Sequence, residues 1–431
     1  MNRHTPRLII VILFIMCLCP MAWALDWPTH RHDNHRSGYT PETLKPPLIQ
    51  QWQTATNQPA QPAWSEYPAQ QDLWQNFYKN KPRLSSDRAF HLVVGNRHLY
   101  YGSSSSDKVI CRSIEDGRVR WTHTTGGPIR FAPTLYQGRV YIGSDDGTVY
   151  CLDGAKGKEI WTHQPDFAAV KMMVYGRLSS VCPIRTSVLV DQGVAYWSAG
   201  VFAGEQTGLR RVLSACRAEN GQILWTRTPP KPLHGYPLAT REQLFMPAGK
   251  STPLSLRKSD GMVLGDFNAN SRHGGSYAIL SHDNKLLFGP HYSEAGSYVE
   301  QYDANTQSAE ALGWGPGNHM VVTPSACFYL SDTTLSKFDW NEKKRLWSVP
   351  SRYPDALILA GSLLFAGGQD QVAAIETSAG SVVWQAQVSG RVQDLVVANQ
   401  CLFVSTSLGH IYCFKASNHS EPVVSGSGQS D

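Results

Sequence analysis

The tripeptide Pro-Ile-Arg occurs twice, ending at Arg130 and at Arg185, and each copy precedes a segment with the alternating pattern of a β-strand. Two guanidinium groups brought together could hold a carboxylate or phosphate ligand through paired hydrogen bonds. Other cationic side chains at comparable places could join them: Arg83, Arg177, Arg272, His273 and His319. Arginines in such loops can instead satisfy backbone carbonyls or pair with an acid, so both interpretations stay open.

Histidines and acids elsewhere give weaker signals. His30, His32 and His35 stand close together, but their turn-forming neighbours favour an irregular lid segment over a metal site. A catalytic role for His91 would need a nucleophile or acid as partner, and the sequence does not show one. The acidic stretch at 143–147 (GSDDG) lacks the further carboxylates of a calcium loop and is typical of a hairpin turn. We therefore predict no catalytic residue and no metal site.

The N-terminus has the features of an export signal. It carries two arginines, an apolar run at 8–18 too short to span a bilayer comfortably, and a small-residue cleavage site ending at Ala24. We expect residues 1–24 to be removed and the mature protein to be periplasmic or secreted, without a transmembrane segment. The net charge of +5 includes no long basic run, so nothing indicates nucleic acid as a partner.

Cysteines do not form a zinc or redox motif in this chain. No CxxC occurs, and several cysteines fall mid-strand, where a small buried thiol is expected. Near the C-terminus, a turn at 407–409 would place Cys413 opposite Phe403 and leave Cys401 as its diagonal neighbour. Diagonal positions lie near the upper limit for a bridge, so we predict no disulfide there.

A repeat of about 40 residues organises the chain. Its unit is an alternating strand, a turn, a second strand and then Gly-x-x-x-Trp, as in RVYIGSDDGTVYCLDGAKGKEIW at 139–161. Such a unit with four short strands is one blade of a β-propeller, which must pack against two neighbours and therefore closes into a ring. The tryptophans that end the units are expected to pack between blades: Trp52, Trp121, Trp161, Trp225, Trp347 and Trp384.

We predict an all-β, eight-bladed propeller over residues 91–416, with seven blades as the fallback. The last unit lacks its tryptophan strand, and residues 47–54 supply it. Residues 25–90 form a lid segment that contains this closing strand, and 417–431 a disordered tail. The predicted blades are 91–125, 128–165, 182–229, 235–268, 274–313, 318–350, 353–390, and 391–416 with 47–54.

These repeats resemble the quinoprotein-alcohol-dehydrogenase-like propellers, whose repeat takes its name from pyrroloquinoline quinone (PQQ). The resemblance covers roughly residues 45–416, and it is closer still to a subgroup of secreted bacterial PQQ-like propeller proteins through DWPTHRHDNHRSGYT (26–40), DRAFHLVVGNRHLYYGSSSSDKVICRS (87–113) and GRLSSVCPIRTSVLVDQGVAYWSAG (176–200). Enzymes of this family hold PQQ at the ring centre, usually with Ca²⁺, and many stack the quinone on a disulfide of adjacent cysteines. This chain has no adjacent cysteines, and none of the calcium ligands can be placed on it.

The leading prediction is a non-catalytic binding or scaffold protein that uses the propeller's faces and central funnel, with a protein or a small anionic ligand as partner. One alternative is a PQQ-dependent, or other small-ligand, oxidoreductase with a divergent site. Another is a glycan-binding propeller, because several tryptophans that we expect to be exposed lie outside the blade positions: Trp64, Trp74, Trp197 and Trp314.

Overall fold

The computed structural model describes residues 26–55, 58–61, 88–174, 176–200, 211–248, 251–266, 277–289, 299–303, 306, 308–314 and 317–417. Almost every regular element there is a strand, the exception being one turn of 3-10 helix, η1, at Asp166–Ala169. The predicted export signal, the C-terminal tail and most of 57–84 lie outside the described residues. In the part that is described, no helix is long and apolar enough to cross a membrane.

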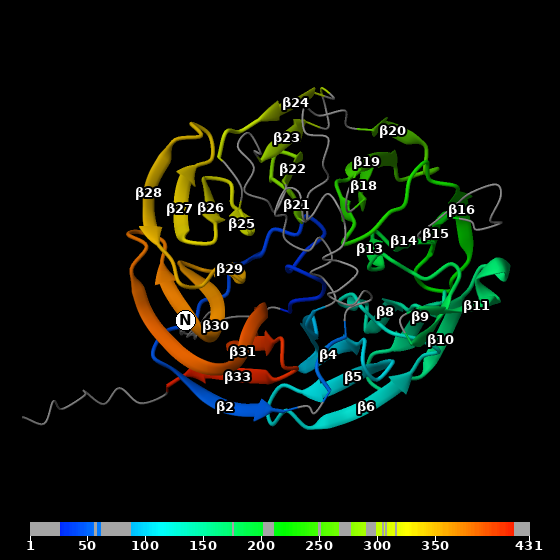
Figure 1. The fold of residues 1–431 in the computed structure, drawn as a ribbon, viewed down its shortest axis with the longest axis horizontal. Coiled ribbons are helices and arrows are strands. Elements are labelled where there is room, and N and C mark those ends of the chain that lie inside the picture. The colour runs from blue at the N-terminus through cyan, green and yellow to red at the C-terminus, as the bar shows by residue number, and fades with distance from the viewer. Residues whose placement is uncertain are drawn as a thin grey trace, which may run out of the picture.

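Antiparallel four-stranded sheets follow one another along the chain, and Figure 1 shows them arranged around a common centre. The first three contain β3 (Leu92–Gly95), β4 (His98–Ser103), β5 (Lys108–Ser113) and β6 (Val119–Thr124); β7 (Thr134–Tyr136), β8 (Arg139–Gly143), β9 (Val149–Asp153) and β10 (Glu159–His163); and β13 (Leu189–Asp191), β14 (Val194–Ala199), β15 (Val212–Arg217) and β16 (Ile223–Arg227). In each sheet the first strand in sequence lies innermost and the fourth outermost.

Three more sheets of the same kind complete most of the circle. They contain β17 (Leu238–Ala239), β18 (Gln243–Ala248), β19 (Ser251–Arg257) and β20 (Val263–Asp266); β21 (Tyr277–Leu280), β22 (Lys285–Gly289), β23 (Glu300–Asp303) and β24 (Ser308–Ala311); and β25 (His319–Val322), β26 (Ala326–Leu330), β27 (Thr334–Asp339) and β28 (Arg345–Pro350). Between the second and third sheets, η1 leads into a separate two-stranded hairpin of β11 (Lys171–Val174) and β12 (Arg177–Ser180).

The last sheet has seven strands and contains both the first and the last strand of the described residues. Its order is β1 (Tyr39–Thr40), β29 (Ala356–Ala360), β30 (Leu363–Glu376), β31 (Val382–Ala398), β32 (Cys401–Thr406), β33 (Ile411–Ala416) and β2 (Leu48–Thr54). The long strand β31 pairs with β30 over its first part and with β32 over its last part. Strand β2 pairs antiparallel with β33, and β31 contacts β3, so residues from the two ends of the chain meet where the circle closes.

The repeat tryptophans join neighbouring sheets in a regular way. The indole Nε1 of Trp121 donates to the Gly154 carbonyl oxygen of the next sheet at 3.0 Å. The other five make the same kind of bond at 2.9–3.2 Å: Trp52 to Ile114, Trp161 to Ala218, Trp225 to Lys258, Trp347 to Thr377 and Trp384 to Leu48. Five of these indoles therefore contribute apolar packing and a directed hydrogen bond to the contact between two sheets, and that of Trp384 connects β31 to β2 within the seven-stranded sheet.

The glycine of each Gly-x-x-x-Trp unit lies against the tryptophan of the preceding sheet. Gly157 has φ +68°, and a Cβ there would lie 2.4 Å from Cε3 of Trp121. Gly138 has a similar φ of +74° but open space around it. Gly138→Ala is therefore expected to lower the unfolding free energy by about 1–2 kcal/mol from backbone strain alone.

Gly157→Ala is expected to lower it by about 1–3 kcal/mol more than Gly138→Ala, because the new methyl group must also displace the indole. Urea unfolding of the two variants measures the difference. Equal losses would show that the glycine does not serve the contact between sheets.

Residues 26–44, called the plug below, cross the centre of the circle, where Figure 1 shows the N-terminal segment in blue. Trp27, which is 1 % exposed, exchanges backbone hydrogen bonds with Val94 of β3. The carbonyl oxygen of Pro28 accepts from the backbone N–H of Leu135 in the next sheet at 2.7 Å. The plug therefore begins by pairing with the innermost strands of the first two sheets.

The rest of the plug contacts the remaining sheets in turn. Hydrogen bonds join Asn34 to Val190 and Ala239, His35 to Leu280, Gly38 to Leu359 and Glu42 to Gln400. The side chain of Arg31 donates to the carbonyl oxygens of Met320 and Leu357. All of these partners except Gln400 belong to the innermost strands of their sheets. The chain's own N-terminal residues thus contact the inner edges of successive sheets around the centre of the circle.

Candidate functional site

The predicted arginine pair is brought together around a single acid. Arg130 donates from Nε to Oδ2 of Asp145 at 2.6 Å, and Nη2 of Arg185 lies 3.5 Å from the same oxygen. All three side chains are buried, with exposed fractions of 2–6 %. Asp145 belongs to the GSDDG turn, so that turn supplies a counter-ion as well as a bend. Of the two interpretations open from the sequence, the structure shows arginines paired with a nearby acid.

Gln61 connects this group to Arg177. The backbone carbonyl oxygen of Gln61 accepts from Nη1 of Arg130 at 2.7 Å, and its side-chain Oε1 accepts from Nη1 of Arg177 at 2.7 Å. Arg177 also pairs with Asp107 and donates to the carbonyl oxygen of Ser104. Arg130 and Arg177 are thus connected through one residue and are both held in place. Three other predicted cationic candidates, Arg83, Arg272 and His273, lie outside the described residues.

His234 adds a neutral base to the same region. Its ring lies against Phe131, with centroids 5.4 Å apart. Burial, helped by the nearby positive charges of Arg185 and Arg130, lowers the pKa of His234 to about 3. The histidine is therefore uncharged in the folded protein at neutral pH.

This depressed pKa predicts that stability falls on acidification. Between pH 6.5 and about 3 the unfolded chain binds a proton at His234 that the folded protein does not, so stability falls as pH falls through this range. Between pH 7.5 and pH 5 the loss from this group is about 2 kcal/mol. Urea unfolding at the two pH values, compared with His234→Gln, measures it. An equally large loss in His234→Gln would assign the effect to other groups.

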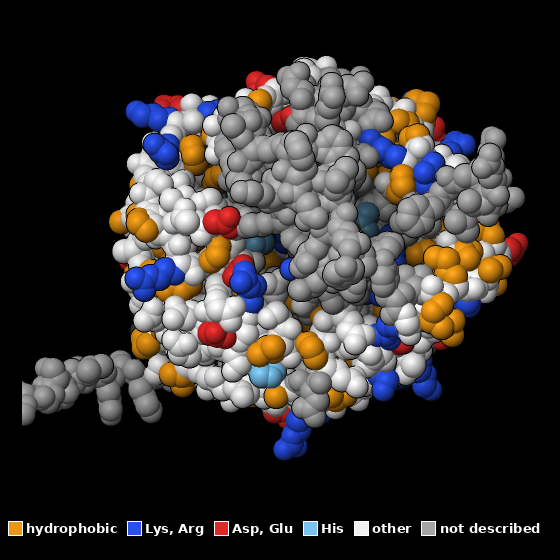
Figure 2. All heavy atoms as spheres, viewed as in Figure 1, with side chains coloured by type: hydrophobic (Ala, Val, Ile, Leu, Met, Phe, Trp, Pro, Cys, Tyr) orange, Lys and Arg blue, Asp and Glu red, His pale blue; other side chains and the backbone are white. Residues whose placement is uncertain are grey.

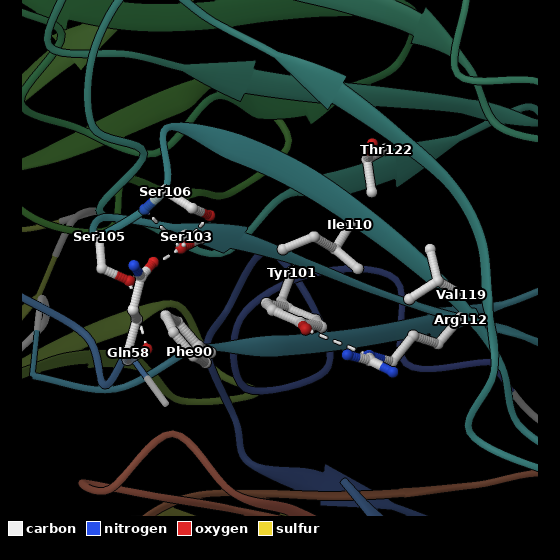
Figure 3. Close-up of a pocket in the computed structure, with 10 residues that line it drawn as sticks. All are labelled: Gln58, Phe90, Tyr101, Ser103, Ser105, Ser106, Ile110, Arg112, Val119 and Thr122. Atoms are coloured by element: carbon white, nitrogen blue, oxygen red, sulfur yellow. Dashed lines mark hydrogen bonds between the residues drawn. The ribbon is translucent and has the colours of Figure 1, made fainter. Parts of the chain in front are cut away.

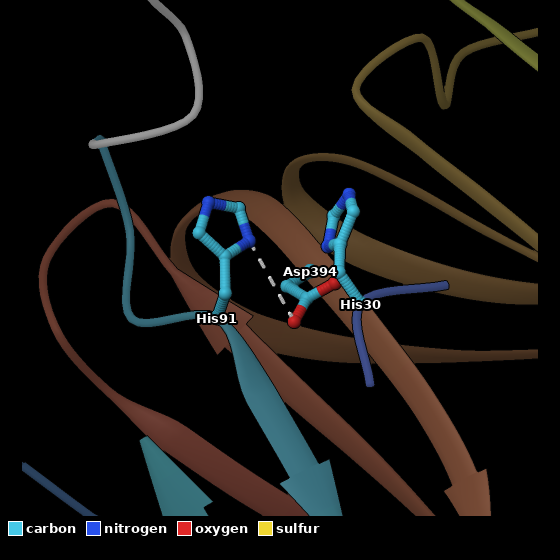
Figure 4. A group of neighbouring side chains, drawn as sticks. All are labelled: His30, His91 and Asp394. Atoms are coloured by element: carbon cyan, nitrogen blue, oxygen red, sulfur yellow. Dashed lines mark ion pairs between the residues drawn. The ribbon is translucent and has the colours of Figure 1, made fainter. Parts of the chain in front are cut away.

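A second group lies where the plug meets the first and last sheets. His30 of the plug, His91 just before β3 and Asp394 of β31 have nitrogen and oxygen atoms that all lie within 4.8 Å of one another (Figure 4). Nδ1 of His91 is 3.8 Å from Oδ2 of Asp394, which also accepts from the backbone N–H of Leu92 at 2.8 Å. His319, the remaining cationic candidate, is near enough to help lower the pKa of His30.

Tyr236 fixes the orientation of this group. Its ring stacks on His30 with centroids 3.6 Å apart and an interplanar angle of 15°, and it meets His91 edge-on at 5.9 Å. Desolvation by burial is the main cause of the lowered pKa of His30, with further contributions from the charges of His91, Arg36 and Arg31. His30 is therefore a neutral imidazole, the form in which histidine binds metals.

The sequence did not single out this group. Its members stand 61 and 303 residues apart in the chain, so no local spacing relates them. The sequence placed His30 together with His32 and His35, but His32 instead lies beside Trp27, with ring centroids 5.1 Å apart. Asp394 lies on a strand without any motif, and only the tertiary arrangement brings it to His91.

A cavity of about 320 Å³ lies on the first sheet (Figure 3). It is lined by side chains of β4, β5 and β6 together with Gln58, Phe90 and the serines at 105 and 106. Its one charged side chain, Arg112, donates to the Tyr101 hydroxyl at 3.1 Å and to the Gly117 carbonyl oxygen at 2.7 Å. The lining offers hydroxyl groups for hydrogen bonding, and it contains no carboxylate, histidine or thiol for acid–base or nucleophilic chemistry.

Two expectations about aromatic and sulfur side chains can be compared with the structure. Trp197 was expected to be exposed, but it is fully buried between strands, so that expectation is wrong. Trp314 stacks on Phe338 with centroids 4.5 Å apart, while Trp64 and Trp74 lie outside the described residues. Cys413 pairs with Phe403 and Cys401 with Lys415, which confirms the predicted register. All seven described cysteines are buried free thiols.

Comparison with known proteins identifies the family. A family model described as "Outer membrane protein assembly factor BamB" matches residues 66–189 and 317–420, more than half of the chain. The chain belongs to this family. The outer membrane protein assembly factor BamB of Burkholderia pseudomallei is 24 % identical over 284 residues, which cover 64 % of this chain and 70 % of that protein. The resemblance to PQQ-like propellers predicted from the repeat is thereby confirmed.

Quinohemoprotein alcohol dehydrogenases are also similar to this chain. ADH IIB of Pseudomonas putida is 30 % identical over 104 residues, which span 24 % of this chain and 13 % of that enzyme. Solved structures of ADHIIG from P. putida HK5 and of the Comamonas testosteroni enzyme each give a TM-score of 0.61, at 12 % and 14 % identity. The superposed regions cover 94 % and 92 % of this chain, respectively, and 82 % of each enzyme. At such identities the likeness shows the β-propeller fold.

The described residues at the centre do not fit PQQ with Ca²⁺. Calcium requires six to eight oxygen ligands, whereas the group at His30 supplies two imidazoles and one carboxylate. PQQ is a tricarboxylate and would need cationic partners, but Arg130 and Arg185 already face Asp145. No step of quinone chemistry is therefore assigned to this chain.

Proposed function

We propose that this protein is an exported, non-catalytic binding protein that recruits a protein partner through the outer surface of an eight-bladed propeller. Six four-stranded sheets support six of the blades. The seven-stranded sheet supports the other two, because the first part of β30 pairs with β29 and its last part with β31, while the first part of β31 pairs with β30 and its last part with β32. Membership of the BamB family supports export, with residues 1–24 removed as a signal. The plug supports a role for the outer surface, because it crosses the centre of the circle.

The β11–β12 hairpin is the observation that carries this proposal. Four apolar side chains on it are 36–66 % exposed: Val170 just before β11, Met172 and Met173 within it, and Leu178 on β12. Figure 2 shows hydrophobic side chains gathered where β10 and β11 lie at the edge of the molecule in Figure 1. Contiguous exposed apolar groups mark protein interaction sites, and methionine side chains adapt readily to a partner's shape.

A photocrosslinking amino acid in place of Met173 tests the proposal, with the mature protein incubated in cell-envelope extract. We expect one dominant crosslinked protein, and we expect Leu178→Glu in the same chain to reduce the yield at least tenfold. Ile49→Glu is the matched control, because Ile49 is an apolar residue of comparable exposure on β2, 50 % against 58 % for Leu178, and does not belong to the hairpin. A yield that is unchanged by Leu178→Glu, or lost equally with Ile49→Glu, would contradict a binding role for the hairpin.

A cofactor titration separates this proposal from the oxidoreductase alternative. Addition of PQQ and Ca²⁺ to the purified protein is expected to produce neither cofactor uptake nor dye-linked alcohol oxidation. Stoichiometric uptake with turnover would favour the enzyme instead.

A further inference from the structure

We propose that His30, His91 and Asp394 bind a divalent transition-metal ion of the zinc class that fixes the plug to the point where the ring closes. Two imidazoles with one carboxylate form a donor set that suits Zn²⁺ and its first-row neighbours and disfavours Ca²⁺ and Mg²⁺. The three side chains come from three separate parts of the chain: the plug, the residue before β3, and β31.

The distances fit a common ion better than direct hydrogen bonds. At 3.8 Å, Nδ1 of His91 and Oδ2 of Asp394 are too far apart for a good hydrogen bond. In a tetrahedral zinc site, bonds of about 2.0–2.1 Å leave neighbouring ligand atoms about 3.3 Å apart. Since all three ligand atoms already lie within 4.8 Å of one another, side-chain movements of about 1 Å would bring them into place.

The surroundings hold the ligands ready. Nδ1 of His30 is inaccessible to solvent and has no hydrogen-bond partner among the described residues. Tyr236 stacks on the face of the His30 ring and leaves its nitrogen-bearing edges available. The backbone N–H of Leu92 donates to Asp394 and orients the carboxylate, as outer hydrogen bonds do in known metal sites.

Nearby positive charges are already directed elsewhere. The guanidinium of Arg31 donates to the carbonyl oxygens of Leu357 and Arg36. Arg36 donates to Pro237 and to backbone carbonyls of the plug. A bound cation would meet these two charges, with Asp33 and Asp394 as the acids that offset them.

Equilibrium dialysis of the metal-stripped mature protein against Zn²⁺, with metal analysis, tests the site. We expect one ion per chain, a Co²⁺ derivative with visible d–d absorption, and no comparable binding of Ca²⁺ or Mg²⁺. Zn²⁺ is also expected to raise the melting temperature by several degrees, because it binds the folded state alone. A stoichiometry near zero, or equal binding of Ca²⁺, would overturn the proposal.

Ligand variants locate the ion. His30→Ala, His91→Ala and Asp394→Asn are each expected to weaken Zn²⁺ binding at least tenfold, whereas His35→Ala and His98→Ala should bind as the wild type does. Asp394→Asn keeps an acceptor for the Leu92 N–H, so it separates metal binding from folding if the alanine variants are unstable. Wild-type affinity in Asp394→Asn would exclude this site.

Discussion

Replacing Asp145 with alanine is expected to lower the unfolding free energy by about 3–5 kcal/mol, because it leaves two buried guanidiniums without their shared counter-ion. Burial removes the water that would otherwise solvate Arg130 and Arg185, and among the ion pairs of the described residues the Asp145 carboxylate is shared by both. Asp145→Asn keeps the shape but loses the charge, so we expect a smaller loss than with alanine. Urea unfolding monitored by tryptophan fluorescence measures both variants.

A second substitution tests the cause of this loss. Removing one cation as well, in Asp145→Ala with Arg130→Met, should recover part of the lost stability, because only one of the two buried guanidiniums then lacks the Asp145 carboxylate. The control is Asp116→Ala, since Asp116 pairs with Arg118 on the surface with side chains 42 % and 84 % exposed. Because water and salt screen that exposed pair, its removal should change stability far less than Asp145→Ala does. No recovery in the double variant would mean that Asp145 acts through the turn rather than through its charge.

Arg36→Ala is expected to lower the unfolding free energy by at least about 3 kcal/mol and to release the plug. Arg36 is 1 % exposed and donates two hydrogen bonds to the carbonyl oxygen of Pro237, just before β17, at 2.8 and 3.0 Å. It also donates to Thr29, His30 and Asp33 within the plug. One side chain thereby folds the plug on itself and attaches it to the fourth sheet.

Two measurements check the Arg36 prediction. Thermal unfolding should show the lower stability, and limited proteolysis should cut within 26–44 in the variant and leave the wild type intact. Arg118→Ala, which removes an exposed arginine, is expected to change neither. A plug that stays protected in Arg36→Ala would show that its backbone pairing with β3 and β29 is sufficient.

The strands could be predicted from the sequence because their signals are local. Alternating apolar residues, turn-forming Asp-Gly pairs and the Gly-x-x-x-Trp spacing all act within about 20 residues, so RVYIGSDDGTVYCLDGAKGKEIW already specifies β8, β9 and β10. The pairing of 47–54 with the last strand could also be predicted, because the final repeat lacks its own tryptophan strand. The β11–β12 hairpin was not foreseen, because it is an insertion without a counterpart among the other described strands.

The site could be predicted only in part. The Pro-Ile-Arg repeat correctly placed Arg130 and Arg185 near each other, since they occupy equivalent places in successive sheets. Their neutralisation by Asp145 depends on a side-chain direction that a turn motif does not specify. The proximity of Asp394 to His91 and the burial of Trp197 depend on how whole sheets pack, which the residues adjacent in sequence do not encode.

The pairing of β2 with β33 has a consequence for how the protein folds. The indole of Trp384 bonds to Leu48 across 336 residues of sequence, and Glu42 reaches Gln400 across 358. Contacts of such separation are entropically costly to form early, so the ring should close late and slowly. Contacts that form after the folding transition state slow unfolding when they are strengthened. The pairing of β2 with β33 would then mainly slow the unfolding of the protein. A chain without β33, and so without this pairing, would keep most of its sheets but unfold much faster.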